Sequence, residues 1–251
     1  MTSSASKSAT SLALSLALSL LVLLGGVWVV LTVWYPRSFW SVSGIGRIGA
    51  YAVGVHLGLT ALLILPWRSR GREGSRVQFD VAVLTWILIA AALLSLSVLA
   101  SGRPVALVYA VDRVTLVRAN EIRASELATL GSIGPGLRWS GPLPLWATSP
   151  SKDADRLDAI QLAIAGFDLP QRPARWEPVQ LHRALIVQSA KHVSSLKRAR
   201  HQPHSDAVIR ELGLSHYLPM DGVTGHWVLA VDTQLRNYVP IELDEPVAPE
   251  K

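Results

Sequence analysis

Three long stretches without a charged residue lie in the first hundred positions of the chain, at residues 11–34, 48–67 and 81–102. A bilayer has a hydrocarbon core of about 30 Å, which a helix of roughly 20 apolar residues crosses. Inside lipid the backbone has no water to bond, so a helix is the form open to each stretch. The pattern predicts a membrane protein with three N-terminal transmembrane helices in residues 1–102. A small α+β extracytoplasmic domain at residues 103–251 would follow.

The first stretch is longer than the apolar part of a cleaved signal peptide, which spans about 7–15 residues. It continues as Trp34-Tyr35-Pro36-Arg37, without the small residues of a cleavage site. We therefore expect it to be retained as a span.

Arginines set the expected orientation. The loop at residues 68–76 carries four arginines, whereas the loop before the second stretch carries Arg37 and Arg47. Short loops rich in Lys and Arg stay in the cytoplasm. The pattern predicts a cytoplasmic N-terminus and, after three crossings, a C-terminal domain on the far side, which is the periplasm in a bacterium.

The net charge of +6 does not indicate nucleic-acid binding, because most of the excess lies before Ser101 and belongs to membrane topology. One basic run, residues 191–200, is either a solvated helix face or a docking patch for headgroups or an acidic partner. The chain has no cysteine, which excludes disulfides and thiolate chemistry.

In the outer domain, residues 105–117 have the composition of a strand, as do residues 226–231 and 238–243. We expect these three strands to form a small antiparallel sheet. Helices are predicted at about 120–130, from 151 to Gly166, at 179–197 and at 206–212, with an irregular stretch at 131–150.

No catalytic, cofactor or metal site is predicted, and the chain is not expected to be an enzyme. The run Gly44-Ile45-Gly46-Arg47-Ile48-Gly49 matches a dinucleotide fingerprint but precedes an apolar stretch where a strand–helix unit would be needed. His201, His204 and Asp206 lie in a polar, proline-broken segment without a fourth ligand.

Ala50, Gly54 and Gly58 recur every four residues in the second stretch. Such a row of small residues lets helix backbones approach closely. It either packs the chain's own spans or pairs with a membrane helix of another protein. His56, in the same stretch, is either a packed neutral histidine or a proton site. Asp112 and Arg113 form a local charge pair.

An ordered set of short motifs surrounds these stretches. They are Trp34-Tyr35-Pro36 with Phe39, Val77-Gln78-Phe79-Asp80, Gly102-Arg103-Pro104-Val105, Val111-Asp112-Arg113-Val114, Ala119-Asn120-Glu121-Ile122, Tyr217-Leu218-Pro219-Met220, and 225–232. Together they resemble the TfpX/TfpZ (FimB-like) family of type IV pilin accessory proteins. The chain departs from that family at residues 58–62, where members usually show Gly-Pro-Leu-Leu-Thr, and at Val114, where others have Phe.

The resemblance implies an inner-membrane, chaperone-like accessory protein that supports the stability of a cognate type IV pilin and pilus assembly. Its partners would be that pilin and the lipid bilayer, with no nucleic acid. Six residues are candidates for partner binding: Ala50, Gly54, Gly58, Asp112, Arg113 and Trp227. An exposed sheet edge could also meet the pilin by strand addition. The alternative is a membrane-anchored enzyme acting on a pilin or a lipid-linked substrate.

Overall fold

The computed structural model describes residues 14, 17, 18, 20–69, 75–110, 112–127, 142–150, 153–198, 203–223 and 225–244. The chain divides into two compact units. The first combines Met1–Thr32 with Ile45–Ser101, and the second combines Val33–Gly44 with Gly102–Lys251. The division therefore differs from a single cut after residue 102, because the connector at residues 33–44 belongs to the second unit.

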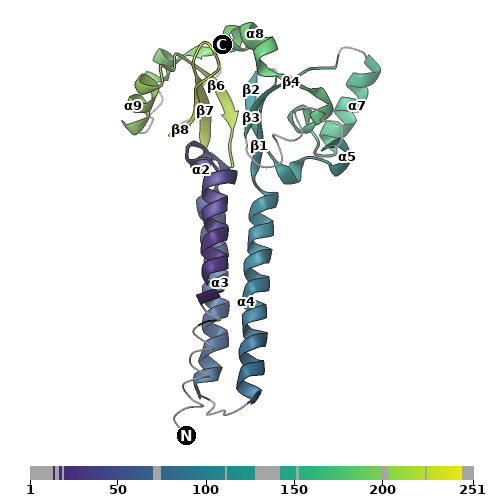
Figure 1. The fold of residues 1–251 in the computed structure, drawn as a ribbon. Helices are drawn as coiled ribbons and strands as arrows, with labels where there is room; N and C mark the ends of the chain where they lie inside the picture. Colours follow the sequence, from purple (N-terminus) through teal and green to yellow (C-terminus); the bar gives the residue numbers. More distant parts are fainter. Residues whose placement is uncertain are drawn as a thin grey trace. The chain divides into compact units, whose positions relative to one another are not determined.

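The first unit is helical (Figure 1). It holds the helix Leu20–Trp34 as far as Thr32, together with α3 (Ile45–Ser69) and α4 (Ser75–Ser101). The last turn of the first helix, η1 (Val30–Trp34), is a π-helix. Within the described residues, Ala82–Ser101 is long and apolar enough to cross a membrane. A second candidate span arises if Leu20–Trp34 and Arg37–Ser43, which meet at a bend, count as one broken helix. The described helices thus provide one or two apolar spans, and a third span stays a prediction.

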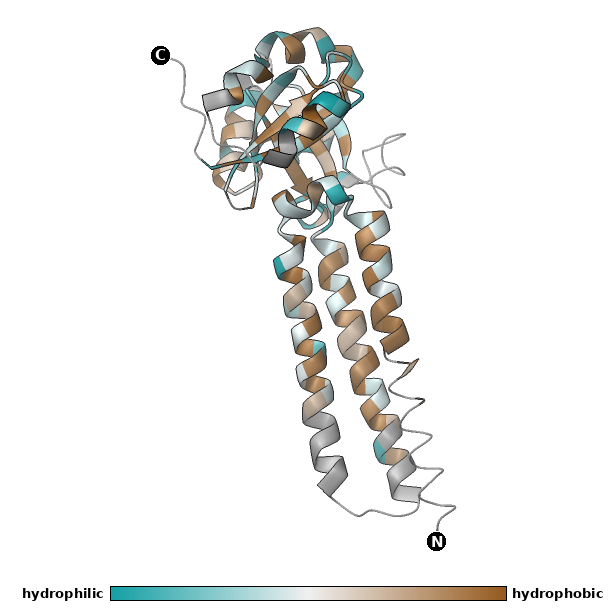
Figure 2. Ribbon diagram, turned by 90° about the vertical axis from the view of Figure 1, so that its left-hand side faces the viewer, coloured by the Kyte–Doolittle hydropathy of each residue, from teal (hydrophilic) through white to brown (hydrophobic). Residues whose placement is uncertain are grey.

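Packing in the first unit buries one side of α4. Leu88, Ala92 and Leu99 are buried there. At Gly26 of the first helix, an added Cβ would lie 3.3 Å from Leu96 of α4, so glycine permits a close approach. Many other large apolar side chains face outward, including Trp28, Tyr51, Phe79, Trp86 and Leu94, and Figure 2 shows the apolar colouring along these helices.

The second unit contains a mixed sheet that has eight strands in the described residues. They are β1 (Pro104–Ala110), β2 (Arg113–Arg118), β3 (Leu143–Ala147), β4 (Trp176–Pro178), β5 (Lys191–His192), β6 (His216–Asp221), β7 (His226–Val231) and β8 (Tyr238–Leu243). The order is β4-β3-β1-β2-β6-β7-β8, with β5 also paired to β6. The β1–β3 and β2–β6 pairs are parallel and the other pairs are antiparallel.

Short helices accompany this sheet. They are α2 (Trp40–Ser43), α5 (Ala124–Leu127), α7 (Asp153–Ile164), α8 (Arg183–Ser189) and α9 (Pro203–Glu211). Between them lie the 3-10 turns η2 (Arg37–Phe39), η3 (Ala119–Glu121), η5 (Leu169–Gln171), η6 (Pro173–Arg175), η7 (Val179–His182) and η8 (Val193–Arg198). Three of the helices, α2, α8 and α9, add Val42, Ile186 and Ile209 to the core clusters of the sheet. In Figure 1, α5 and α7 lie beside the β1–β3 part of the sheet and α9 lies beside the β6–β8 part.

The central strand β1 is buried along its whole length. Side chains of a strand alternate between faces, and β1 divides accordingly. Leu107 and Tyr109 join one core cluster, whereas Ala106 and Val108 join another. A strand covered on both faces reads as a continuous apolar run, which accounts for the sequence of β1.

The predicted single strand at residues 105–117 is wrong. The chain turns back at Asp112 and forms the hairpin β1–β2 with Ala110 opposite Arg113. The predicted three-stranded antiparallel sheet is also wrong, because β2 pairs in parallel with β6, and β6 separates it from β7 and β8. The predicted strands at 226–231 and 238–243 are confirmed as β7 and β8.

Two further predictions need correction. The stretch 131–150, predicted to be irregular, contains β3, although residues 128–141 lie outside the described part of the chain. The predicted helix at 179–197 breaks after Ser189, because Ala190 has extended backbone and Lys191–His192 pairs with β6. Tertiary pairing overrides helical propensity there. The helix ending before Gly166 is confirmed as α7, and Gly166 has a φ of 86°.

Candidate partner-binding surfaces

The row Ala50, Gly54 and Gly58 lies on an exposed side of α3. A Cβ added at Gly54 or Gly58 would meet nothing within 4 Å. By contrast, a Cβ added at Gly26 in the same unit would lie 3.3 Å from Leu96, as expected where two helices pack closely. The described helices therefore leave this row open, and its pairing with a membrane helix of another protein stays a prediction.

His56, on the same helix, is buried, with 4% of its surface exposed. Its Nδ1 has no hydrogen-bond partner among the described residues, while Thr60 Oγ1 donates to the carbonyl of His56 at 2.8 Å. A buried polar atom without a partner lowers stability. The structure thus places His56 away from the open row.

The connector at residues 33–44 packs into the core of the sheet unit. Phe39 and Val42 are 3% and 0% exposed, and both belong to the cluster that includes Leu107 and Leu229. The ring of Phe39 meets that of Tyr238 edge-on, with centroids 6.3 Å apart. The backbone N–H of Val223 donates to the carbonyl of Val42 at 3.2 Å. The connector is therefore a structural part of the sheet unit.

Local chemistry shapes the connector. The indole Nε1 of Trp40 donates to the carbonyl of Tyr35 at 2.6 Å. Gly44 ends α2 with a φ of 68°, a left-handed conformation that suits glycine. Burial raises the pKa of Tyr35 to about 12, partly opposed by the positive charges of Arg118 and Arg103. Tyr35 therefore stays a neutral phenol at physiological pH.

Asp112 and Arg113 lie at the β1–β2 turn, both exposed. Arg113 Nε lies 3.2 Å from Asp112 Oδ1, and Arg113 Nη1 lies 3.6 Å from Asp221 Oδ1 on β6. Thr115 Oγ1 donates to the other Asp221 oxygen at 3.3 Å. The hydrogen bond that Arg113 donates to Asp112 is the main reason why the pKa of Arg113 is raised. The predicted local pair is thus part of a small exposed cluster that links the hairpin to β6.

Trp227 lies in the core and is 7% exposed. It sits on β7 opposite Met220 and Glu242. A Cβ added at Gly222 would lie 2.3 Å from Trp227 Cδ1, so glycine leaves the room that the indole occupies. The structure gives this side chain a packing role, and a partner contact through it stays a prediction.

β8 lies at one end of the strand order and β4 at the other. Among the described residues, β8 pairs only with β7, so its outer side is an edge. An edge of this kind is a template for another strand. β8 contains Pro240, a residue that sheets accept at edges.

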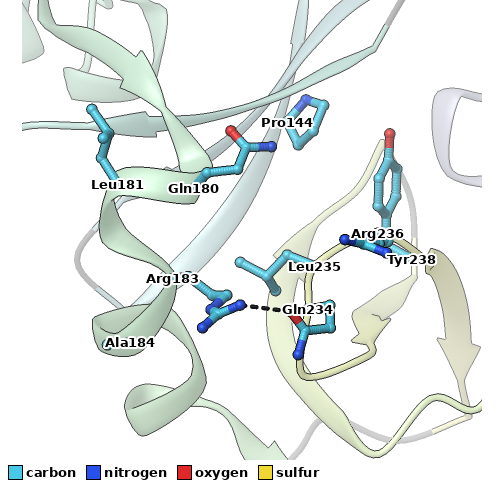
Figure 3. Close-up of a pocket in the computed structure, with 9 residues that line it drawn as sticks. All are labelled: Pro144, Gln180, Leu181, Arg183, Ala184, Gln234, Leu235, Arg236 and Tyr238. Atoms are coloured by element: carbon cyan, nitrogen blue, oxygen red, sulfur yellow. Dashed lines mark hydrogen bonds between the residues drawn. The ribbon is translucent and has the colours of Figure 1, made fainter.

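A pocket of about 600 Å³ opens in the sheet unit (Figure 3). One wall comes from η7 and α8, and the other from the loop between β7 and β8, with Pro144 of β3 beside them. The lining residues are Pro144, Gln180, Leu181, Arg183, Ala184, Gln234, Leu235, Arg236 and Tyr238. Arg183 Nη1 donates to Gln234 Oε1 at 2.6 Å, which joins the two walls.

Asp232 fixes the loop that forms the second wall. Its Oδ1 accepts from the backbone N–H of Arg236 at 2.9 Å, and its Oδ2 accepts from the backbone N–H of Asn237 at 3.3 Å. Leu235 has a φ of 55°, which is uncommon for a residue with a Cβ, and its side chain is buried. The loop is therefore held in one conformation.

Sequence reasoning did not find the connector or the pocket. The aromatic run Trp34-Tyr35 with Phe39 and Trp40 signalled a buried connector, because aromatic side chains bury large areas. The pocket joins residues far apart in the sequence, such as Arg183 and Gln234, which are 51 positions apart, and no local pattern indicates this. Of the rejected metal motif, His201 lies outside the described residues, and the described residues contain no group of three or more His, Asp or Glu that could hold a metal ion.

The chain is similar over most of its length to two fimbrial assembly proteins of Dichelobacter nodosus. It is 22% identical to the protein of serogroup I over 230 residues, which cover 88% of this chain and 89% of that protein. It is 20% identical to the protein of serogroup E1 over 232 residues, which cover 89% and 90% of the two chains. No family model matches the chain, and no solved structure matches it.

Proposed function

We propose that this chain is a fimbrial assembly protein that acts in the bacterial inner membrane. The observation that carries the proposal is the similarity to the two fimbrial assembly proteins, which runs through about nine-tenths of both partners in each comparison. Such coverage includes the helical unit and the sheet unit together, so it concerns the whole architecture and not one shared module.

We further propose that the first unit crosses the bilayer three times. α3 and α4 contain 25 and 27 residues. At about 1.5 Å per residue, each exceeds the roughly 30 Å of a hydrocarbon core. The outward-facing Trp28, Tyr51 and Trp86 suit a lipid surrounding better than water. The arginine-rich loop supports an N-terminus in the cytoplasm and a sheet unit in the periplasm.

Fusions to alkaline phosphatase test this orientation, since that enzyme is active only in the periplasm. A fusion at Lys251 should be active and one at Gly71 inactive. The reverse pattern, or activity at both positions, contradicts the three-span arrangement.

The proposed action is binding, without catalysis. A type IV pilin waits in the inner membrane as an apolar helix that carries a periplasmic head. The open row Ala50, Gly54 and Gly58 suits close approach of that helix, because nothing in the described chain fills the space above the glycines. The outer side of β8 suits strand addition by the head. Holding both parts would keep a pilin from aggregating before assembly.

Deleting the gene tests the function as a whole. The mutant should lose surface fimbriae in electron micrographs, and a plasmid copy should restore them. A chaperone-like role further predicts a lower amount of the cognate pilin in the mutant membranes. Normal fimbriation in the mutant would refute the proposal, and lost fimbriae with normal pilin levels would refute the chaperone-like part of it.

A leucine on the row tests the helix contact. Gly54→Leu should accumulate normally but lose pilin co-purification, because the added bulk blocks close approach. Gly25→Leu is a matched control, since Gly25 is also exposed with nothing within 4 Å of an added Cβ. Equal co-purification by the two variants would contradict a pilin contact at the row.

A further inference from the structure

We propose that the pocket between η7–α8 and the β7–β8 loop binds an acidic peptide segment, with Arg183 and Arg236 contacting its carboxylates. The inference deepens the proposed function and rests on it only for the source of the peptide, which would be the fimbrial subunit. The recognition chemistry itself follows from the residues that line the pocket.

The first reason is charge. Two guanidinium groups and no carboxylate line the pocket. Arg183 is exposed and uses one N–H on the neutral amide of Gln234, and neither arginine has an ion-pair partner among the described residues. Asp232 lies in the adjoining loop, and its two oxygens accept hydrogen bonds from the backbone N–H groups of Arg236 and Asn237 and not from a guanidinium. Two guanidinium groups against one neighbouring carboxylate leave the pocket with a net positive charge, and guanidinium groups bind carboxylates through paired hydrogen bonds.

The second reason is the size and mixed character of the lining. A volume of about 600 Å³ lies in the range of ordinary ligand pockets and is far more than a single phosphate needs. Gln180 and Gln234 carry amides, which can donate to and accept from a peptide backbone. Leu181, which is exposed, and Tyr238 offer apolar surface for a neighbouring side chain. Charge, amide and apolar groups together favour a peptide over an inorganic ion or a lipid headgroup.

The third reason is that much of the pocket is already ordered. Asp232 holds the loop backbone, and the buried Leu235 holds it onto the core. The Arg183–Gln234 hydrogen bond joins the two walls (Figure 3). A binding site whose groups are held in place loses less entropy when a ligand binds. Tyr238 also contacts Phe39 of the connector, so the pocket wall rests on the core.

Fluorescence anisotropy with the full-length protein in nanodiscs of zwitterionic lipid tests the proposal. The probe is a fluorescein-labelled octapeptide of alternating glutamate and leucine, and its counterpart has glutamine in place of glutamate. The acidic probe should bind at least tenfold more tightly. R183Q and R236Q should each weaken its binding about tenfold, as expected for loss of a charged hydrogen bond. A184W should abolish binding by filling the space, because Ala184 lines the pocket.

R210Q is the matched control, since Arg210 is exposed on α9 and does not line the pocket. It should bind the acidic probe like the unchanged protein. Equal binding of the two probes, or binding that R183Q and R236Q leave unchanged, would overturn the proposal. So would arginine-dependent binding of inorganic phosphate or of phosphatidylglycerol vesicles without binding of the acidic probe, which would assign the pocket to phosphate or to a lipid headgroup.

The outcome is separable from that of the gene deletion. If the deletion abolishes fimbriae but the acidic probe does not bind, the pocket proposal fails alone. If the probe binds as expected but the deletion mutant keeps its fimbriae, the proposed function fails and the acidic-peptide site stands.

Discussion

The substitution Phe39→Ala measures how far the connector stabilises the sheet unit. Phe39 is 3% exposed and lies in the main core cluster. Truncating a buried phenylalanine to alanine costs about 3–5 kcal/mol through lost burial and the cavity that remains. The edge-on contact with Tyr238 belongs to that loss. For a unit of this size, each kcal/mol lowers the melting temperature by about 2–4 °C, so we expect a fall of roughly 6–20 °C.

Thermal unfolding of the purified full-length protein in detergent, followed by tryptophan fluorescence, supplies the measurement. Phe79→Ala is the matched control, because it removes the same atoms from a position on α4 that is 70% exposed. Its melting temperature should stay within about 2 °C of the unchanged protein, as for surface substitutions. If the two variants melt at the same temperature, the connector does not belong to the core of the sheet unit.

Two further predictions concern single contacts of the sheet unit. Gly222→Ala should destabilise it by about 1–3 kcal/mol, because the new Cβ would lie 2.3 Å from Trp227 Cδ1. The control Gly46→Ala on α3 should not destabilise the protein, because its new Cβ meets nothing within 4 Å. Equal denaturation midpoints of the two variants would contradict the clash. His182 Nε2 lies 2.6 Å from Glu177 Oε2, and the hydrogen bond between them is the main cause of the lowered pKa of Glu177. This pair stabilises the fold above the ordinary pKa of glutamate, and the stabilisation is lost as the pH falls through the lowered pKa. His182→Phe keeps a ring to stack on Trp146 but removes the hydrogen bond to Glu177. It should therefore destabilise the protein more at about pH 6 than at about pH 2.5 in denaturant titrations. An equal effect at both pH values would contradict the assignment.

The strands β7 and β8 could be predicted from the sequence because their apolar runs are bounded by a polar loop, residues 232–237. Their register follows from the same loop, in which Asp232 binds the backbone of Arg236 and Asn237. The information needed was local, and local patterns are what a sequence displays.

Proline concealed other strands. β6 contains Pro219, which a central strand does not usually accept. On one side of β6, however, β5 pairs with His216 and Tyr217, and β2 pairs with Met220 and Asp221. Pro219 lies in the gap between these two neighbours, so its missing N–H need not interrupt a ladder. β3 was concealed similarly, because Pro144 lies near its start in a proline-rich stretch.

The open row on α3 was predictable as a motif, whereas its exposure was not. Spacing shows that Ala50, Gly54 and Gly58 share one side of a helix. Spacing does not show whether that side packs against α4 or stays exposed. In the structure α4 buries Leu88, Ala92 and Leu99, while the row on α3 is exposed. Because α4 is apolar all round, its sequence gives no preferred face.

The burial of the connector also changes where the outer domain can be separated from the rest. A cut at residue 103, as the sequence suggested, removes Phe39 and Val42 from the core cluster. Burying side chains of this kind contributes about 1.5–3 kcal/mol each, which is a large part of the net stability of a small domain.

The fragment 103–251 should therefore melt at a lower temperature than the sheet unit of the full-length protein and should bind the hydrophobic dye ANS. Adding a synthetic peptide of residues 33–44 should raise its melting temperature and reduce the dye signal, because the peptide restores the missing core side chains. The same peptide with Phe39→Ala should have a weaker effect, since the buried ring is the largest side chain it would return to the cluster. A fragment that melts like the full-length protein without any peptide would show that the core closes without the connector.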